Sequence, residues 1–117
     1  MNYMPVHIGR RLVILEVESI DWIEADGNYA VIHQAGKTYT LRKSLRDLET
    51  RLDRWTFFRI GRSVILNRMR IKELRIGRWD HQVVLDNGKV FTWGRRYRQN
   101  LRRMLSLHPE GRARCAL

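Results

Sequence analysis

The segment that most constrains this chain is FFRIGRSVILN, residues 57–67. Two aromatic residues open it, Arg59 and Arg62 stand on either side of its glycine, and an apolar run leads to Asn67. Aromatic and β-branched residues favour extended backbone, and guanidinium groups suit a turn that faces an anion. The segment therefore predicts a basic turn held rigidly at the tip of a sheet and followed by a buried strand.

The size of the chain fits one domain. It has 117 residues, of which 44% are hydrophobic, enough for a real core. We expect a folded core over residues 6–106 and a flexible tail over residues 107–117, which holds the single cysteine, Cys115. No apolar run has the length of a membrane span and residues 1–11 lack the core of a signal peptide, so the sequence predicts a cytoplasmic protein.

Short strands account for most of the pattern. Trp22 interrupts the apolar alternation of its segment, which predicts a strand packed on both faces. Turn residues separate the segments, with Asp, Gly and Asn at 26–28 and again at 86–88. The expected strands cover residues 6–8, 11–15, 20–24, 29–33, 37–41, 64–66, 71–76, 81–85 and 89–93.

Two segments have helical periodicity instead. Leu45, Leu48 and Leu52 follow Ser44, which suits the N-cap position, so a short amphipathic helix is expected near residues 44–53. A second helix is expected near residues 95–106, with an apolar stripe of Tyr97, Leu101, Met104 and Leu105. The predicted fold class is mainly β with minor α.

The net positive charge is concentrated in the second half of the chain. Residues 1–41 carry three Lys/Arg and five Asp/Glu, whereas residues 54–117 carry sixteen and four. Nineteen of the 23 basic residues are arginine, whose planar fork matches phosphate and the guanine edge. This segregation predicts a polyanionic partner.

Two other function classes remain open at this point. Trp79 and Trp93 could stack bases in a single-stranded RNA or non-specific nucleic-acid binder. A magnesium-dependent nuclease would need carboxylates such as Glu24 and its acidic neighbours, but their spacing matches no ligand motif. No phosphate loop, Cys/His set or activated serine is present, so we expect no enzyme, no cofactor and no metal site.

Taken in order, four groups of residues resemble the signatures of the LytTR domain, the DNA-binding output domain of LytR/AlgR-type bacterial response regulators. They are residues 20–29; residues 39–45 with Leu48 and Leu52; residues 58–60 with Arg62, Ser63 and Asn67; and residues 84–88 with Arg95 and Tyr97. The resemblance covers residues 6–105. It implies an elongated array of short antiparallel sheets that inserts loops into successive major grooves of double-stranded DNA and regulates transcription.

The resemblance also implies which side chains touch DNA. Asn28, Arg62 and Arg95 would contact bases, because an amide can pair with adenine and a guanidinium with guanine. This interpretation requires three distant turns to converge on one edge of the β scaffold. The residues expected to contact phosphates, which set register rather than sequence choice, are Arg42, Lys43, Arg59, Ser63, Arg96 and Arg98.

Two positions depart from the family pattern. Gly61 stands where the family usually has histidine, and Gly94 replaces a small hydroxyl residue. Each change removes a polar side chain beside an expected base contact and frees the backbone, so the sequence preference or the affinity should differ from the family norm. The resemblance leaves two forms of regulation open: an output domain with a receiver domain or regulatory partner outside this chain, or a stand-alone regulator. By analogy with dimeric DNA readers we expect repeated half-sites, and a homodimer on DNA remains open.

Overall fold

The computed structural model describes residues 2–106, which form ten strands, two α-helices and three short 3-10 turns. The elements are β1 (Tyr3–Ile8), β2 (Arg11–Glu16), the 3-10 turn Val17–Ser19, β3 (Trp22–Asp26), β4 (Tyr29–Gln34), β5 (Lys37–Leu41), α1 (Leu45–Glu49), β6 (Phe57–Arg59), β7 (Val64–Asn67), the 3-10 turn Arg68–Arg70, β8 (Ile71–Ile76), β9 (His81–Leu85), β10 (Val90–Trp93), the 3-10 turn Arg95–Tyr97 and α2 (Arg98–Ser106).

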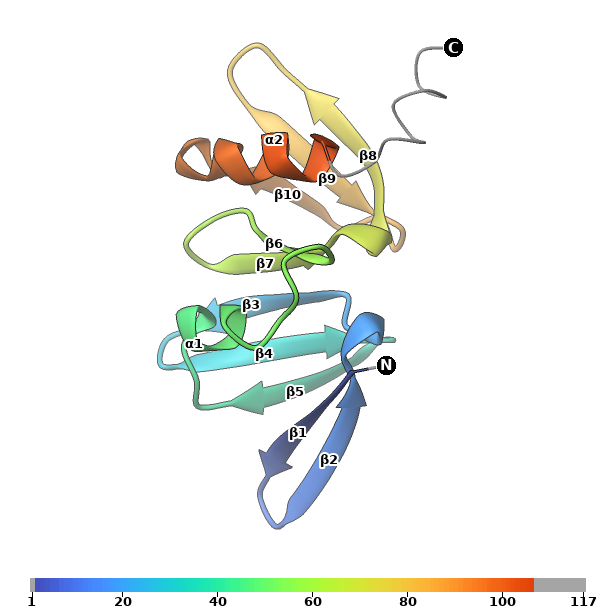
Figure 1. Cartoon of the computed structure of the whole chain (residues 1–117), viewed down its shortest axis with the longest axis vertical. Coiled ribbons are helices and arrows are strands. Elements are labelled where there is room, and N and C mark those ends of the chain that lie inside the picture. The colour runs from blue at the N-terminus through green and yellow to red at the C-terminus, as the bar shows by residue number, and fades with distance from the viewer. Residues whose placement is uncertain (1, 107–117) are drawn as a thin grey trace.

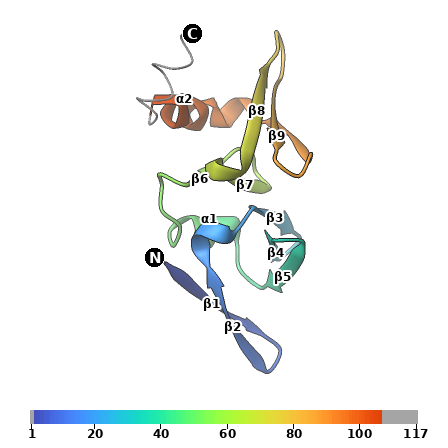
Figure 2. The ribbon, with the colours of Figure 1, turned by 90° about the vertical axis from the view of Figure 1, so that its right-hand side faces the viewer.

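The strands form three antiparallel sheets stacked along a molecule of 51 × 30 × 25 Å (Figure 1). The β1–β2 hairpin lies at one end, the five-stranded sheet β5-β4-β3-β7-β6 in the middle, and the sheet β10-β9-β8 with α2 at the other end. Figure 2 shows the same succession from the side. The predicted fold class, mainly β and elongated, is confirmed.

The five-stranded sheet separates two hydrophobic clusters. Ile23 and Ile65 join the cluster that includes α1 and the hairpin, whereas Trp22 and Leu66 join the cluster that includes β9, β10 and α2. Successive side chains of a strand point to opposite faces, so each neighbouring pair serves both clusters. The prediction that the Trp22 strand packs on both faces is confirmed.

Both helices form where the periodicity predicted them, with shorter bounds. The Ser44 hydroxyl accepts a hydrogen bond from the Asp47 N–H, at 3.0 Å, and so caps α1. Leu52 is buried although α1 ends at Glu49. In α2, Leu101 and Met104 are buried, but Leu105 is 50% exposed, so its predicted place in the apolar stripe is wrong. It follows Met104 directly and is therefore turned about 100° around the helix axis.

The first turn of the middle sheet is tighter than predicted. β3 covers Trp22–Asp26 rather than residues 20–24, because Ala25 and Asp26 pair with the start of β4. The turn is thus reduced to Gly27 and Asn28, and Gly27 has a φ of +60°, which a glycine adopts without strain. Asn28 consequently lies at the tip of a two-residue hairpin.

Over residues 2–106, no helix has both the length and the apolar character that crossing a membrane requires. The tail expected over residues 107–117, which includes Cys115, lies outside the described residues.

Candidate nucleic-acid interface

The strand order places two of the predicted turns at the same end of the middle sheet. β3 lies between β4 and β7 and runs antiparallel to both, so the β3–β4 turn and the β6–β7 turn are neighbours. The Ala25 N–H donates a hydrogen bond to the Ser63 carbonyl oxygen, at 2.8 Å, across this end of the sheet. The turn that holds Asn28 therefore lies beside the turn that holds Arg62.

A second backbone contact brings in the third segment. The Gly94 N–H donates to the Ile60 carbonyl oxygen, at 2.6 Å, and joins the end of β10 to the start of the β6–β7 turn. Arg95 follows immediately, in the 3-10 turn Arg95–Tyr97. All three segments lie on the left-hand side of Figure 1. Asn28, Arg62 and Arg95 thus come from turns on one edge of the scaffold.

The side chains at this edge have few partners of their own. Asn28, Arg62 and Arg95 are all exposed. Within residues 2–106, no hydrogen bond or ion pair holds the side chain of Asn28 or Arg62, and Arg95 makes only a long contact of 3.5 Å with the Trp79 carbonyl oxygen. Guanidinium groups that no carboxylate neutralises make the edge a favourable place for an anion.

Four of the six predicted phosphate contacts flank this edge. β5 ends beside the start of β4, where Leu41 pairs with Ala30, so Arg42 and Lys43 continue the chain past the same edge. Ser63 is exposed in the β6–β7 turn, and Arg96 is exposed next to Arg95. The edge therefore carries basic side chains on both sides of the three turns.

The other two predicted phosphate contacts are already engaged inside the protein. A terminal nitrogen of Arg98, Nη2, donates to the Trp79 carbonyl oxygen at 3.0 Å. Arg59 makes an ion pair with Glu49 and donates to two carbonyl oxygens of the β6–β7 turn. Their expected contacts with phosphate stay predictions.

Sequence reasoning missed two residues that support the edge. The Asn100 side-chain amide donates to the Arg59 carbonyl oxygen at 2.8 Å, so α2 holds the end of β6. Glu49, at the end of α1, forms an ion pair with the Arg59 guanidinium. Neither residue stands out in the sequence, because Asn100 is a polar residue among arginines and Glu49 resembles any exposed helical carboxylate.

One of the two candidate base-stacking residues is excluded by burial. Trp93 is 1% exposed, and its indole N–H donates to the Tyr97 carbonyl oxygen at 2.8 Å. Its predicted availability for stacking is therefore wrong. Trp79 is 69% exposed and lies in the β8–β9 turn. Trp55 and Tyr29, the first residue of β4, are exposed as well, so exposed aromatic side chains leave the RNA-binding alternative open to test.

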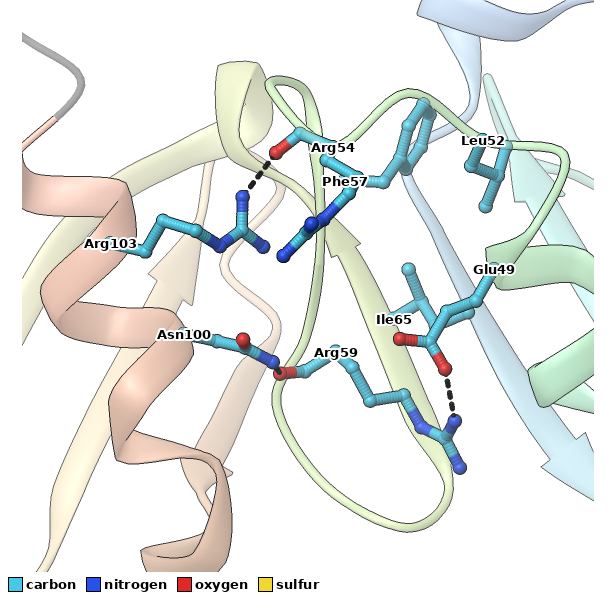
Figure 3. A pocket seen from close by; sticks show the side chains of 8 residues that line it. All are labelled: Glu49, Leu52, Arg54, Phe57, Arg59, Ile65, Asn100 and Arg103. Atoms are coloured by element: carbon cyan, nitrogen blue, oxygen red, sulfur yellow. Dashed lines mark hydrogen bonds and ion pairs between the residues drawn. The ribbon is translucent and has the colours of Figure 1, made fainter.

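A small cavity lies between α1, β6 and α2, and Figure 3 shows its lining of Glu49, Leu52, Arg54, Phe57, Arg59, Ile65, Asn100 and Arg103. Burial lowers the pKa of Arg103, and the nearby charge of Arg54 lowers this pKa further. The Arg103 guanidinium lies 4.2 Å from the centre of the Phe58 ring. The cavity holds about 70 Å³, well below the roughly 300–1,000 Å³ of ligand pockets. The cavity matters because Arg59, which lines it, contacts two other lining residues, Glu49 and Asn100.

The acidic half of the chain forms structural contacts. Glu24 lies 2.6 Å from a ring nitrogen of His33, and that ring stacks on Trp22 with centroids 4.0 Å apart. Asp21 pairs with Arg70 at 2.9 Å. Among residues 2–106, no group of three or more His, Cys, Asp or Glu side chains is arranged to hold a metal ion.

The two glycines that depart from the family pattern differ in their surroundings. A Cβ added at Gly61 would meet nothing within 4 Å. At Gly94 it would lie 3.0 Å from the Ile60 carbonyl oxygen and 3.2 Å from the Tyr97 ring. Gly94 also has an ordinary φ of −62°. The reason for glycine there is the close approach of two backbones, rather than conformational freedom.

Comparisons with known proteins agree with this geometry. The family model of the LytTR DNA-binding domain matches residues 10–106. The chain is 29% identical over 107 residues to the transcriptional regulatory protein LytR of Staphylococcus aureus strain N315, covering 89% of this chain and 43% of LytR. It is 33% identical over 64 residues to the heme-containing CO-sensing transcriptional regulator RcoM 2 of Paraburkholderia xenovorans, covering 55% of this chain and 24% of that protein.

A solved structure supports the fold. The LytTR DNA-binding domain of a putative methyl-accepting/DNA response regulator from Bacillus cereus superposes with a TM-score of 0.78, at 21% identity, over 90% of this chain and 97% of that one. The chain spans less than half the length of the curated relatives it matches. The matched family is one of DNA-binding domains rather than enzymes, in agreement with the expectation from the sequence. Because its model matches residues 10–106, this chain belongs to the LytTR family of DNA-binding domains.

Proposed function

We propose that this domain binds double-stranded DNA in a sequence-specific manner and serves a bacterial transcriptional regulator. The observation that carries the proposal is the edge at which the Ala25–Ser63 and Gly94–Ile60 backbone hydrogen bonds gather three turns. Turns that protrude from one edge of a rigid sheet can enter the grooves on one side of a duplex. Their unpaired guanidinium groups favour a negatively charged partner.

The proposed base contacts are Asn28, Arg62 and Arg95. An asparagine amide can pair with N6 and N7 of adenine, and an arginine fork can pair with O6 and N7 of guanine. The exposure of the three side chains and their weak engagement within the protein support these roles. Successive major grooves are the proposed targets of the turns.

The proposed phosphate contacts fix the domain on the duplex. They are Arg42, Lys43, Ser63, Arg96 and Arg98. Arg59 is not among them, because Glu49 and two carbonyl oxygens of the β6–β7 turn already engage its guanidinium. Each neutralised phosphate releases counterions, so the logarithm of the affinity falls with the logarithm of the salt concentration by about 0.9 per contact. Four charged contacts predict a slope of about −3.6.

Selection of bound sequences from a random duplex library, at two salt concentrations, tests the proposal. We expect an enriched motif, built of repeated short elements. Arg62→Ala and Arg95→Ala should each cost about 1–3 kcal/mol on the selected duplex and little on a random one. Arg96→Ala should weaken both. Lys37→Ala is the charge-matched control, since Lys37 is exposed and lies at the opposite end of the middle sheet, beside the β4–β5 turn.

Recovery of unenriched sequences, or equal losses on selected and random DNA for Arg62→Ala and Arg95→Ala, would contradict specific readout. A single-stranded RNA competitor is included in the same assay. Preference for RNA would favour the alternative of an RNA-binding module, which the exposed Trp79 keeps worth testing.

The regulatory context belongs to the same proposal. The curated relatives are longer than this chain, so a receiver domain or another regulatory partner is proposed to act on it outside the matched region. Binding to repeated half-sites, as one copy per half-site, follows if the selected motif contains two elements about one helical turn apart.

A further inference from the structure

The Arg59 side chain binds the backbone of the β6–β7 turn. Its Nε donates to the Gly61 carbonyl oxygen and its Nη2 to the Arg62 carbonyl oxygen, both at 2.7 Å. Two consecutive carbonyl oxygens are thus bound by one planar guanidinium. Because this fork is rigid, the two contacts fix the orientation of the peptide that carries Arg62.

Arg59 is itself held from two sides. Its Nη1 forms an ion pair of 2.7 Å with Glu49 at the end of α1, and its carbonyl oxygen accepts the Asn100 amide of α2. Figure 3 shows both contacts, one at each end of the residue. The Arg59 side chain is only 15% exposed, whereas that of Glu49 is 44% exposed. Both helices therefore act on the turn through a single residue.

We infer that Arg59 and Glu49 form a clamp that positions Arg62 for reading DNA, so that Arg59 acts as a positioning residue rather than as a phosphate contact. The inference rests on the proposed function for the role of Arg62. The clamp itself rests on the contacts of Arg59: three of the five guanidinium N–H groups already have acceptors at 2.7 Å. The adjacent carboxylate also offsets the charge that a phosphate would require.

The two roles predict opposite effects for removing a carboxylate. If Arg59 contacts phosphate, Glu49→Ala frees a cation and tightens binding to every duplex. If Arg59 is a clamp, Glu49→Ala weakens binding to the selected duplex severalfold and leaves binding to random DNA unchanged or tighter. Glu73→Ala is the matched control, because Glu73 is another exposed carboxylate paired with an arginine, at 3.4 Å, and lies on β8. It should leave the ratio of the two affinities unchanged.

Arg59→Lys gives an independent measurement. Lysine keeps the charge but cannot bind two carbonyl oxygens and a carboxylate with one planar group. We expect the affinity for the selected duplex to fall about tenfold, the effect of losing about one charge-assisted hydrogen bond, with the salt slope unchanged. A ratio of selected to random affinity equal to wild type in both Arg59→Lys and Glu49→Ala would overturn the inference.

The DNA-free protein separates this inference from the proposed function. Backbone NMR order parameters of residues 61–63 should fall from about 0.85, typical of rigid backbone, toward about 0.6 in Arg59→Lys and Glu49→Ala. Glu73→Ala should leave them unchanged. If no duplex motif is selected at all, the proposed function fails, and the order parameters still decide the clamp: rigid residues 61–63 in both variants would refute it.

Discussion

Asn67 shows how one residue fixes the frame on which the interface is built. It is fully buried, and its amide donates to the carbonyl oxygens of Glu18 and Ile20 at 2.9 and 2.8 Å. Its side-chain oxygen accepts the Met69 N–H at 2.9 Å. The side chain thereby joins the end of β7 to the segment before β3. A buried polar group is tolerated because every hydrogen-bonding atom has a partner.

Asn67→Ala should therefore destabilise the domain by about 3 kcal/mol, since it leaves buried backbone groups without partners. The free energy of unfolding in urea measures the effect. Asn28→Ala is the matched control: its side chain is exposed at a turn, so we expect a change within about 0.5 kcal/mol. Similar losses for both variants would show that the Asn67 contacts do not carry the stability assigned to them.

At the scale of elements, the contact between the end of β10 and the start of the β6–β7 turn matters most. The Gly94 backbone approaches Ile60 so closely that an added Cβ would lie 3.0 Å from a carbonyl oxygen. A backbone atom cannot rotate away as a side chain can. The two elements must separate if the residue is larger than glycine, and Arg95 would move with them.

Gly94→Ala is expected to cost about 1–3 kcal/mol of stability, as overpacking typically does, and to weaken binding to the selected duplex. Gly61→Ala is the control, since the space around Gly61 is open and its φ is not in the left-handed region. It should change stability by less than about 0.5 kcal/mol. Thermal unfolding and the duplex assay measure both effects, and equal tolerance of the two substitutions would contradict the steric explanation.

At the scale of the molecule, one sheet joins two hydrophobic clusters. Ile65 and Leu66 are adjacent in β7, yet the first belongs to the cluster with α1 and the second to the cluster with α2. Disrupting either cluster therefore disturbs the strands that carry the other. This sharing supports the proposal that the chain folds as a single domain.

We expect Ile65→Ala and Leu66→Ala each to lower stability by about 2–5 kcal/mol and to shift one common transition. Far-ultraviolet circular dichroism follows all the strands. The change in tryptophan fluorescence on unfolding comes mainly from Trp22 and Trp93, which are buried in the second cluster, because Trp55 and Trp79 are already exposed in the folded protein. The two signals should coincide in each variant. Two separate unfolding transitions would show that the molecule consists of two units. In that case Ile65→Ala would shift only the transition that circular dichroism detects and would leave the fluorescence transition in place.

Local pattern alone located most of the elements. The β5 strand, the Ser44 cap and the buried leucines of α1 were predictable, because strand alternation, helix capping and helical periodicity depend on residues a few positions apart. The segregation of arginines, and with it the polyanionic partner, was equally readable from the chain. The family resemblance then supplied the candidate base contacts.

Tertiary structure decided what no local pattern contains. The sequence predicts an accessible Trp93 and a buried Leu105, and the structure has Trp93 buried and Leu105 exposed. The reason is that burial depends on which faces two packed elements turn toward each other. Arg59 contacts two residues that lie 10 and 41 positions away, Glu49 and Asn100, and no periodicity specifies these pairings. The edge that gathers Asn28, Arg62 and Arg95 likewise depends on strand order and on two backbone hydrogen bonds between distant segments. Residue types determine which chemistry is available, whereas long-range pairing determines which of those residues meet.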